Sequence, residues 1–294
     1  MMSAWQQIAE QIAQVTGEAF DPLPPNGIGG GCINTTQRLR DGERSFFLKL
    51  NSASLIAMFE AEADGLQALA ASDTLRVPRP ICHGVASGQA YLVLEYIEMG
   101  HAGGSSAALA GRQLAQMHRC SDARFGWIRD NTIGSTPQQN APHHDWIHFW
   151  RAQRLGFQLQ LAEQNGYGRV LQPLGERLLE QFPVLIEHAP VPSLLHGDLW
   201  GGNLAYDQAG NPVIFDPAVY YGDREADLAM TGLFGGFSRD FYAAYQEAWP
   251  LDPGYPVRKR LYNLYHILNH LNMFGGGYLG QAAGMMEGLL AEIG

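Results

Sequence analysis

The chain has 294 residues, about twice the usual size of a single domain, so two lobes or one large domain are expected. Hydrophobic residues make up 46% of it and charged residues only 16%, a balance that excludes an intrinsically disordered protein. The 29 acidic residues against 19 basic ones give a net charge of −10, which argues against a nucleic-acid binder that relies on neutralising phosphates.

The cysteines and the apolar runs indicate the cellular compartment of the protein. Cys32, Cys82 and Cys120 are too widely spaced for a disulfide framework or a metal-ligand set. No run approaches about eighteen uninterrupted apolar residues, and the first residues lack a basic stretch followed by an apolar one. We therefore expect a cytoplasmic protein without a secretory signal and without a membrane partner.

The N-terminal segment predicts one helix and one hairpin. Apolar residues at helical spacing over 4–16, followed by a glycine, predict a first helix. The prolines and glycines that come next exclude a helix there. Asp41-Gly42 is typical of a two-residue hairpin turn, and it joins strands predicted over Thr35–Leu39 and Ser45–Leu50.

A second helix and a linker follow. Residues 54–71 have the apolar spacing of a helix capped by Ser54, and an extended segment and a buried strand come after it. The Gly- and Ser-rich segment 99–106 is typical of a linker, so we place an N-lobe at 1–98 and a C-lobe at 99–294. Helical patterns dominate beyond the linker, over 107–119, 144–164, 170–187 and most of 223–293.

The strongest local signal is the string HGDLWGGN at 196–203, followed by FDP at 215–217. Asp198 and Asn203 lie in a loop between two apolar strands, and Asp216 ends the second strand. The spacing Asp-x4-Asn is that of a kinase catalytic loop, in which the Asp accepts the hydroxyl proton and the Asn holds magnesium. A later Asp is then the main magnesium ligand, because hard cations prefer carboxylate and amide oxygens. Each residue alone is a common loop residue, but the full string predicts chemistry.

These strings resemble the fructosamine kinase family, also called ketosamine-3-kinases, which share a protein-kinase-like fold with aminoglycoside and choline phosphotransferases. The resemblance extends over nearly the whole chain, through FEAEADGLQALA, VPRPICHG, YLVLEYIEM, GRQLAQMHR, DNTIGSTPQQN and FDPAVYYGDREADLAM. The strings DNTIG-TPQ-N and HGDLW-GN are more specific to ketosamine kinases than the catalytic spacing, which many kinases share. The resemblance implies an α+β, protein-kinase-like fold with a small antiparallel-sheet N-lobe and a larger, mainly helical C-lobe.

The resemblance also implies an ATP site. Lys49, on the strand after the hairpin, would neutralise the α- and β-phosphates of ATP. Glu62 on the next helix is the implied ion-pair partner of Lys49, and Glu60, which points elsewhere on a helix, is the alternative. The adenine is expected to meet three residues of LVLEYIEM: Leu94 at the back of its pocket, the C=O of Glu95 and the N–H of Ile97.

A glycine-rich segment ahead of the first strand is the implied cover of the ATP phosphates. The glycines in the run Gly29, Gly30, Gly31 and Cys32 let backbone N–H groups approach phosphates without a side-chain clash. It is not a Walker A loop, since no Gly-Lys-Ser/Thr follows. The Cys32 thiol is either a small apolar filler or, beside Lys49, a thiol of lowered pKa whose oxidation blocks the ATP loop. We therefore expect a monomer or a redox-sensitive dimer.

The implied substrates are ketosamines, in which a ketose is joined to an amine. Asp198 would deprotonate their 3-hydroxyl for attack on ATP, with magnesium on Asn203 and Asp216. Fructosamine, ribulosamine and erythrulosamine, free or on glycated proteins, fit equally well. Trp200 would either stack on a sugar face or pack in the core.

Further polar residues are expected to support the site. Asp227 resembles the helix-borne Asp that braces a catalytic loop through backbone hydrogen bonds, and Asp223 belongs to the same brace or to the sugar pocket. His196 is expected to hold the loop. His266 and His270, four residues apart, are expected to pack in the core, because no third zinc ligand is evident.

Two alternatives remain. One is a small-molecule kinase of the aminoglycoside or choline type, against which the strings DNTIG and HGDLW-GN argue. The other is a non-catalytic ATP-binding module. The retention of Lys49, Asp198, Asn203 and Asp216 argues against it.

Overall fold

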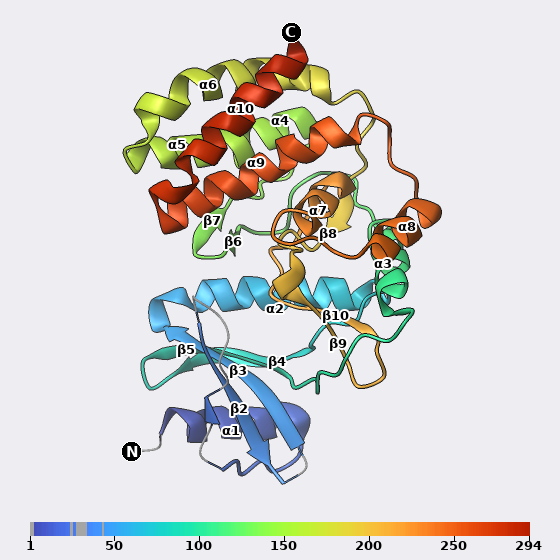
Figure 1. Ribbon diagram of the computed structural model, residues 1–294. Coiled ribbons are helices and arrows are strands. Elements are labelled where there is room, and N and C mark those ends of the chain that lie inside the picture. The colour runs from blue at the N-terminus through green and yellow to red at the C-terminus, as the bar shows by residue number, and fades with distance from the viewer. Residues whose placement is uncertain (1–2, 24–25, 28–33, 43) are drawn as a thin grey trace.

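The computed structural model describes residues 3–23, 26–27, 34–42 and 44–294. The chain forms two lobes that lie one above the other, with the first helix at the outer end of the small lobe (Figure 1). The last helix lies at the far end of the large lobe. A small strand-rich lobe followed by a larger helical one is the order that the sequence predicts.

The small lobe is built on a five-stranded antiparallel sheet with the order β1-β2-β3-β5-β4. Its strands are β1 (Asn26–Gly27), β2 (Thr35–Asp41), β3 (Arg44–Ser52), β4 (Pro80–Ala86) and β5 (Gln89–Glu95). The predicted hairpin is present as β2 and β3. Its predicted turn is wrong by one residue, because Asp41 pairs with Arg44 and so belongs to the strand.

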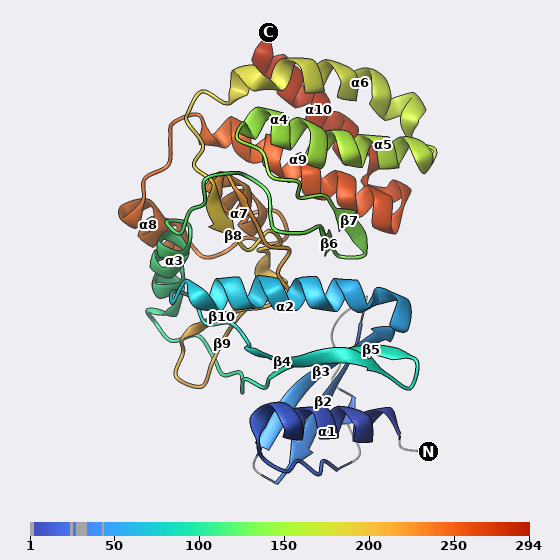
Figure 2. The ribbon, with the colours of Figure 1, turned by 180° about the vertical axis from the view of Figure 1, so that it is seen from behind.

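Two helices cover the two faces of this sheet (Figures 1 and 2). The outer helix is α1 (Ala4–Thr16), which buries Ile8 and Ile12 against the sheet and ends at Gly17 with a φ of +76°. The inner helix is α2 (Ile56–Ala71), which separates the sheet from the large lobe.

The helix α2 belongs to the core of both lobes. It follows a 3-10 turn over Ala53–Leu55, so the predicted Ser54 cap is wrong, and the Ser54 hydroxyl lies within hydrogen-bond distance of another serine. The predicted core residues Phe59, Leu66 and Leu69 are buried in a hydrophobic cluster that continues into the large lobe. The two lobes therefore share one core across α2.

Helices make up most of the large lobe. They are α3 (Ser106–Met117), α4 (Trp146–Trp150), α5 (Phe157–Gln164), α6 (Gly168–Gln181), α7 (Arg224–Thr231), α8 (Arg239–Ala248), α9 (Tyr255–Phe274) and α10 (Leu279–Ile293). A π-helical turn over Arg151–Gly156 joins α4 to α5. The central helix is α9, which is mostly buried and packs against α5, α7 and α10. None of the helices in the described ranges is both long and apolar enough to cross a membrane.

Three pairs of three-residue strands connect these helices. They are β6 (Asn131–Ile133) with β7 (Thr136–Gln138), β8 (Ser193–Leu195) with β11 (Tyr220–Gly222), and β9 (Leu204–Tyr206) with β10 (Pro212–Ile214), all antiparallel. The sequence predicts β8 and β10 and misses the others. A three-residue strand is too short to show an alternating pattern.

The β9–β10 hairpin of the large lobe also holds the linker. Arg76 of the small lobe donates to Asp207 at 2.8 Å and to Glu95 at 3.0 Å, where β5 ends. The N–H of Gly100 donates to the C=O of Tyr206 at 2.8 Å. The β9–β10 hairpin thus bonds both the small lobe, through Arg76, and the segment between β5 and α3, through Gly100.

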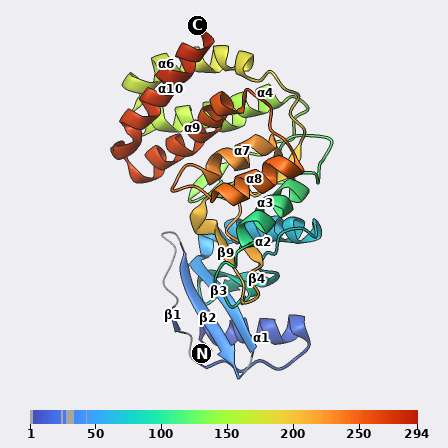
Figure 3. The ribbon, with the colours of Figure 1, turned by 45° about the vertical axis from the view of Figure 1, so that its right-hand side comes forward.

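The contact between α3 and α8 depends on one glycine (Figure 3). A Cβ atom added at Gly111 would lie 2.2 Å from the carbonyl oxygen of Phe241 and 3.1 Å from the nitrogen of Tyr245. We expect Gly111→Ala to lower the free energy of unfolding by about 1–3 kcal/mol, because the backbone of α8 has to shift. The midpoint of thermal unfolding measures the change.

Gly284→Ala is the matched control. Gly284 also lies in a helix, but a Cβ there meets nothing within 4 Å. Alanine is the better helix former by about 1 kcal/mol, so this variant should be at least as stable as the wild type. An unchanged midpoint for Gly111→Ala would contradict the packing of α3 on α8.

Candidate active site

A buried lysine lies between two carboxylates where the lobes meet. Lys49 of β3 donates to Glu62 of α2 and to Asp216, which follows β10, both at 2.5 Å. The side chains of Lys49 and Glu62 are 4% and 10% exposed, whereas that of Asp216 is 51% exposed. Glu60, the alternative partner, instead binds Arg129. One ammonium group therefore joins the small lobe to the segment after β10.

Burial and the neighbouring charges set the protonation of this group. Burial alone would lower the pKa of Lys49, but Glu62 and Asp216 raise it above its ordinary value, so the amine stays protonated at neutral pH. Burial raises the pKa of Glu62, the Lys49 ammonium opposes this rise, and the Asp216 carboxylate adds to it. The site therefore keeps a fixed cation beside a partly exposed carboxylate.

A buried aspartate fixes the loop that runs from β8 to β9. Asp227 of α7 accepts hydrogen bonds from the backbone N–H groups of His196 at 2.7 Å and of Gly197 at 2.8 Å. His118, the residue after the end of α3, lies 3.2 Å from the same carboxylate. Burial alone would raise the pKa of Asp227, but His118 and the N–H of Gly197 lower it overall. The ionised carboxylate holds the start of the loop, as the sequence predicts for Asp227.

The loop turns where only a glycine fits. Gly197 has a φ of +83°, and a Cβ there would lie 2.0 Å from the carbonyl oxygen of Ala218. His196 is buried, which lowers its pKa, and its Nε2 lies 3.0 Å from the C=O of Phe215 while its Nδ1 accepts from the N–H of Asp198. His196 thus ties the loop to the segment around Asp216, the supporting role expected of it.

Asp198 lies at the centre of this loop and is partly exposed. Asn203 Nδ2 donates to the backbone C=O of Asp198 at 2.8 Å and lies 3.4 Å from its carboxylate. Burial, and then the charges of Asp216 and Asp227, raise the pKa of Asp198 to about 7. A carboxylate with a pKa near neutral accepts a proton more readily than an ordinary one does.

Two oxygen atoms near Asp198 are left for a cation. Asn203 is 5% exposed, and neither its Oδ1 nor the Oδ2 of Asp216 accepts a hydrogen bond from any residue that the structure describes. Asp216 has a φ of +56°, an uncommon conformation for a residue other than glycine. One carboxylate and one amide oxygen are ligands that suit magnesium.

The residues predicted to contact the nucleotide base lie at the end of β5 and in the linker. Leu94 is buried and pairs with β3. The N–H of Ile97 donates to no acceptor within the described ranges, while the side chain of Glu95 accepts a hydrogen bond from Arg76. Four predicted phosphate-contacting residues lie outside the described ranges: Gly29, Gly30, Gly31 and Cys32.

Nearly the whole chain matches one protein family. Residues 4–292 match the family model described as fructosamine kinase. The chain belongs to the fructosamine kinase family. A probable ketoamine kinase of Synechocystis sp. is 50% identical over 96% of both chains. A chloroplastic protein-ribulosamine 3-kinase of Oryza sativa subsp. japonica is 45% identical over 94% of this chain and 82% of that one.

Solved structures show the fold of this fructosamine kinase family member. A fructosamine-3-kinase homologue from Haemophilus somnus has a TM-score of 0.90 at 30% identity, over 98% of both chains. A thermostable mutant of the aminoglycoside phosphotransferase APH(4)-Ia and the choline kinase LicA of Streptococcus pneumoniae have TM-scores of 0.61 and 0.62. Both are 14% identical over at least 97% of each chain, which shows the fold alone. The expected α+β, protein-kinase-like fold is confirmed, and so is the enzyme class, an ATP-dependent phosphotransferase.

An aromatic group flanks the loop of this kinase. Trp200 is 38% exposed, so it is not a core residue, and its ring lies so close to Gly202 that a Cβ there would meet it at 2.2 Å. Phe234 lies edge-on to Trp200 at 6.3 Å and 4.7 Å from the ring of His270. His266 is buried, but His270 is partly exposed in this group. No local pattern in the sequence links these three rings.

His118 is a supporting residue that the sequence reasoning does not single out. It is fully buried, with Nδ1 2.9 Å from the hydroxyl of Tyr245 and Nε2 3.2 Å from Asp227. The signal was its place in the string GRQLAQMHR at the end of a helical pattern. Its partner Asp227 lies 109 residues further along the chain, where no local spacing connects the two.

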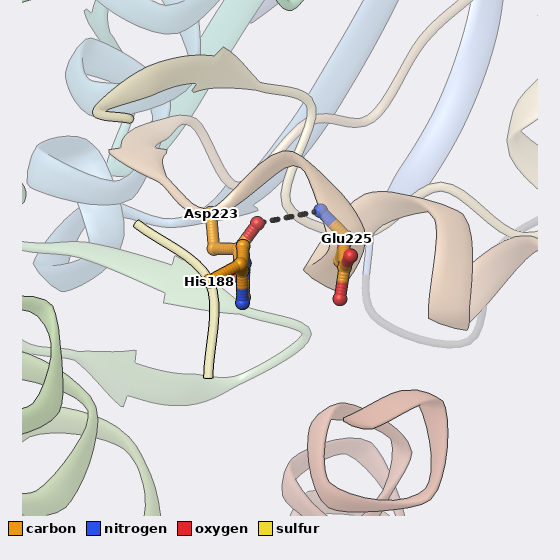
Figure 4. Close-up of side chains that lie close together, drawn as sticks. All are labelled: His188, Asp223 and Glu225. Atoms are coloured by element: carbon orange, nitrogen blue, oxygen red, sulfur yellow. Dashed lines mark hydrogen bonds and ion pairs between the residues drawn. The ribbon is translucent and has the colours of Figure 1, made fainter. Parts of the chain in front are cut away.

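A second cluster of titratable side chains lies at the start of α7 (Figure 4). Among the described residues, His188, Asp223 and Glu225 are the one group of three whose ligand atoms lie within 4.8 Å. Both oxygens of Glu225 accept from Arg258, at 2.6 and 2.9 Å. Asp223 accepts from the N–H of Glu225, from His188 and from the hydroxyl of Tyr262. Each carboxylate oxygen of Asp223 and Glu225 already accepts a hydrogen bond, so the cluster fixes the start of α7.

Lys49→Met removes the buried cation and keeps an unbranched side chain. Glu62 and Asp216 then lie together without a counter-charge, so we expect the free energy of unfolding to fall by about 3 kcal/mol. The double variant Lys49→Met/Glu62→Leu should recover most of this loss, because no fully buried charge stays unpaired. Urea unfolding at pH 7 measures the free energy of unfolding of the single and the double variant. Both variants should lose phosphotransfer activity.

Arg260→Met is the control for loss of an ion pair. Arg260 pairs with Glu292 at the surface, where both side chains are 43% exposed, so its loss should cost less than about 1 kcal/mol. A Lys49→Met protein as stable as the wild type, or a double variant no more stable than the single one, would contradict the account of Lys49.

Proposed function

We propose that this fructosamine kinase family member transfers the γ-phosphoryl group of ATP to the 3-hydroxyl of ketosamines. The acceptors are fructosamine, ribulosamine or erythrulosamine adducts of amines, free or on glycated proteins. The position of Asp198 carries the proposal: a braced loop fixes this partly exposed carboxylate beside Asn203, with its pKa raised to about 7. The names of the ketoamine and ribulosamine kinase relatives support the substrate class.

In this proposal the small lobe and the linker hold ATP. Lys49 neutralises the α- and β-phosphates, and Glu62 keeps its ammonium in place. Leu94 borders the adenine, whose edge meets the C=O of Glu95 and the N–H of Ile97. The glycine-rich segment before β2 covers the phosphates.

Asn203 and Asp216 would hold magnesium. When bound, magnesium neutralises the negative charge that the phosphates carry during transfer. The bond from Asn203 Nδ2 to the C=O of Asp198 orients the amide, so that its Oδ1 is left as a ligand. The same bond couples the proposed metal ligand to the loop of the base.

Asp198 is the proposed base. Its carboxylate takes the proton of the 3-hydroxyl as that oxygen attacks the γ-phosphorus. The bond between the γ-phosphorus and the β–γ bridging oxygen breaks, and ADP leaves with that oxygen. Most of the rate then comes from positioning and charge neutralisation rather than from a covalent intermediate.

Trp200, Phe234 and His270 form the proposed acceptor surface. The exposed ring of Trp200, two residues after Asp198, suits the apolar face of a sugar. His270 Nδ1 donates to the C=O of His266 at 2.8 Å, and burial lowers the pKa of His270, so the ring is neutral at pH 7. Its Nε2 is then an acceptor for a hydroxyl or an ammonium group.

The two alternative functions have less support. The aminoglycoside and choline kinases match at 14% identity, whereas relatives at 45–50% identity are named for ketoamine or ribulosamine substrates. A non-catalytic ATP-binding module does not require Lys49, Asp198, Asn203 and Asp216 in one arrangement. Their hydrogen bonds and ion pairs bring all four together here.

Release of ADP from MgATP with a panel of acceptors tests the proposal. We expect turnover with at least one of ribulosyl-lysine, erythrulosyl-lysine and fructosyl-lysine, and none with choline or kanamycin. Nuclear magnetic resonance of the product should place the phosphate on O3. Turnover with choline or kanamycin alone would refute the substrate class, and no turnover with any acceptor would favour the ATP-binding module.

A further inference from the structure

The hairpin of β6 and β7 lies between α2, which carries Glu62, and the helices of the large lobe (Figures 1 and 2). It contains the string DNTIGSTPQQN at 130–140, in which Asn131 and Gln138 pair across the hairpin. We propose that this hairpin is a positioning element of the active site, which holds the backbone after Asp216 and holds α2 beside it. The inference rests on the role of Asp216 in the proposed function.

Two amides fix the chain just after Asp216. Asn131 Nδ2 donates to the C=O of Val219 at 2.8 Å, and Gln138 Nε2 donates to the C=O of Ala218 at 3.0 Å. The N–H of Ala218 donates at 2.8 Å to the loop that carries the proposed base. This short segment is therefore bonded to the loop on one side and to the hairpin on the other.

The backbone of Asp216 needs this support. Its φ of +56° lies in the left-handed region, which is unfavourable for residues other than glycine. Lys49 bonds only the side chain of Asp216, and Asn203 reaches its C=O at 3.4 Å, a weak contact. The hydrogen bonds to the backbone at 218 and 219 hold Asp216 in this conformation. In this conformation its carboxylate reaches Lys49.

A buried arginine sets the direction of the amides. Arg154 donates to Asn140 Oδ1 at 2.7 Å, and Asn140 donates to Asn131 Oδ1 at 2.9 Å. Gln138 also donates to Asn131 Oδ1, at 2.8 Å, and the hydroxyl of Tyr265 donates to Gln138 Oε1 at 2.8 Å. Both amide oxygens are occupied, so the N–H groups are directed at the backbone. A polar network this deeply buried is costly, and packing alone does not account for it.

The same segment holds α2. Arg129, just before β6, donates to Glu60 at 2.9 Å and to Asp64 at 3.0 Å. These two carboxylates lie two residues before and two residues after Glu62 on the helix. Asn140 in turn donates to the C=O of Arg129 at 3.2 Å. The hairpin segment thus contacts the elements that carry both carboxylate partners of Lys49.

Matched glutamine substitutions separate positioning from packing. Gln138→Met keeps the length of the side chain and removes its donations to Ala218 and Asn131, together with its acceptance from Tyr265. Gln158→Met is the control, because Gln158 is as deeply buried and bonds neighbouring asparagines, but makes no hydrogen bond to 216–219. Both variants lose buried hydrogen bonds, so both should unfold at a lower temperature than the wild type.

The readout is the binding of ADP by calorimetry over a series of magnesium concentrations, with no acceptor present. We expect Gln138→Met to raise the Kd for magnesium-ADP about five- to tenfold, the effect of losing its bond to the backbone at Ala218, and to leave the Kd for metal-free ADP unchanged. In steady-state kinetics, the KM of this variant for MgATP should rise while its KM for the acceptor stays unchanged. Gln158→Met should bind magnesium-ADP within about twofold of the wild type. Equal weakening in both variants, or wild-type binding by Gln138→Met, would overturn the inference.

Arg129→Met decides the question if Gln138→Met does not fold. Its two ion pairs are about one-third exposed, so the variant should fold, and we expect magnesium-ADP to bind about two- to fivefold more weakly. The surface variant Arg260→Met should bind as the wild type does, and wild-type binding by Arg129→Met would overturn the inference. Because no acceptor is present, this outcome is independent of the ketosamine assignment, which the release of ADP tests separately.

Discussion

The buried ammonium group of Lys49 is the interaction on which the arrangement of the active site depends. Its bonds to Glu62 and Asp216 bring together a strand, a helix and a segment of the other lobe. Taking such a charge out of water costs several kcal/mol, and only charged partners with good geometry offset this cost. The ion pairs of Lys49 with Glu62 and Asp216 therefore specify where α2 lies relative to the segment after β10. The Lys49 ammonium also lies beside the carboxylate of Asp216, which we propose as a magnesium ligand. A site for phosphate groups requires such a cation.

Each reactive group in this kinase is held by residues that take no part in the proposed chemistry. Asp227 holds the N–H groups at the start of the loop of Asp198, and the β6–β7 hairpin bonds the backbone after Asp216. The helix that carries Glu62 lies in a hydrophobic core shared by both lobes. Catalysis by positioning needs this rigidity, because a misplaced carboxylate or phosphate forfeits most of the rate. The supporting bonds are spread over α2, α3, α7 and the hairpins, so they come from both lobes.

The sequence predicts the fold class and the reactive residues because their signals are local or shared with a family. Asp198 and Asn203 lie within one loop, and the full string with the later Asp216 indicates a kinase. The supporting residues Asp227 and His196 could be predicted from the strings that contain them. Asn131 could not be predicted, because it bonds a carbonyl 88 residues away and no local pattern records that contact. The predicted turn at Asp41 and the predicted cap at Ser54 are wrong, because the strand ladder and a 3-10 turn extend across them. Short strands such as β6 and β9 gave no periodic signal.

In the proposed mechanism the two carboxylates have different roles: Asp198 takes the proton, while Asp216 belongs to the nucleotide and metal site. The most direct test compares acceptor turnover and MgATP affinity in Asp198→Asn and Asp216→Asn. We expect Asp198→Asn to fold and bind MgATP as the wild type does and to lose turnover by about 10²- to 10⁴-fold, whereas Asp216→Asn loses MgATP affinity. Wild-type turnover in Asp198→Asn, or a loss there that follows from weaker MgATP binding, would contradict the account.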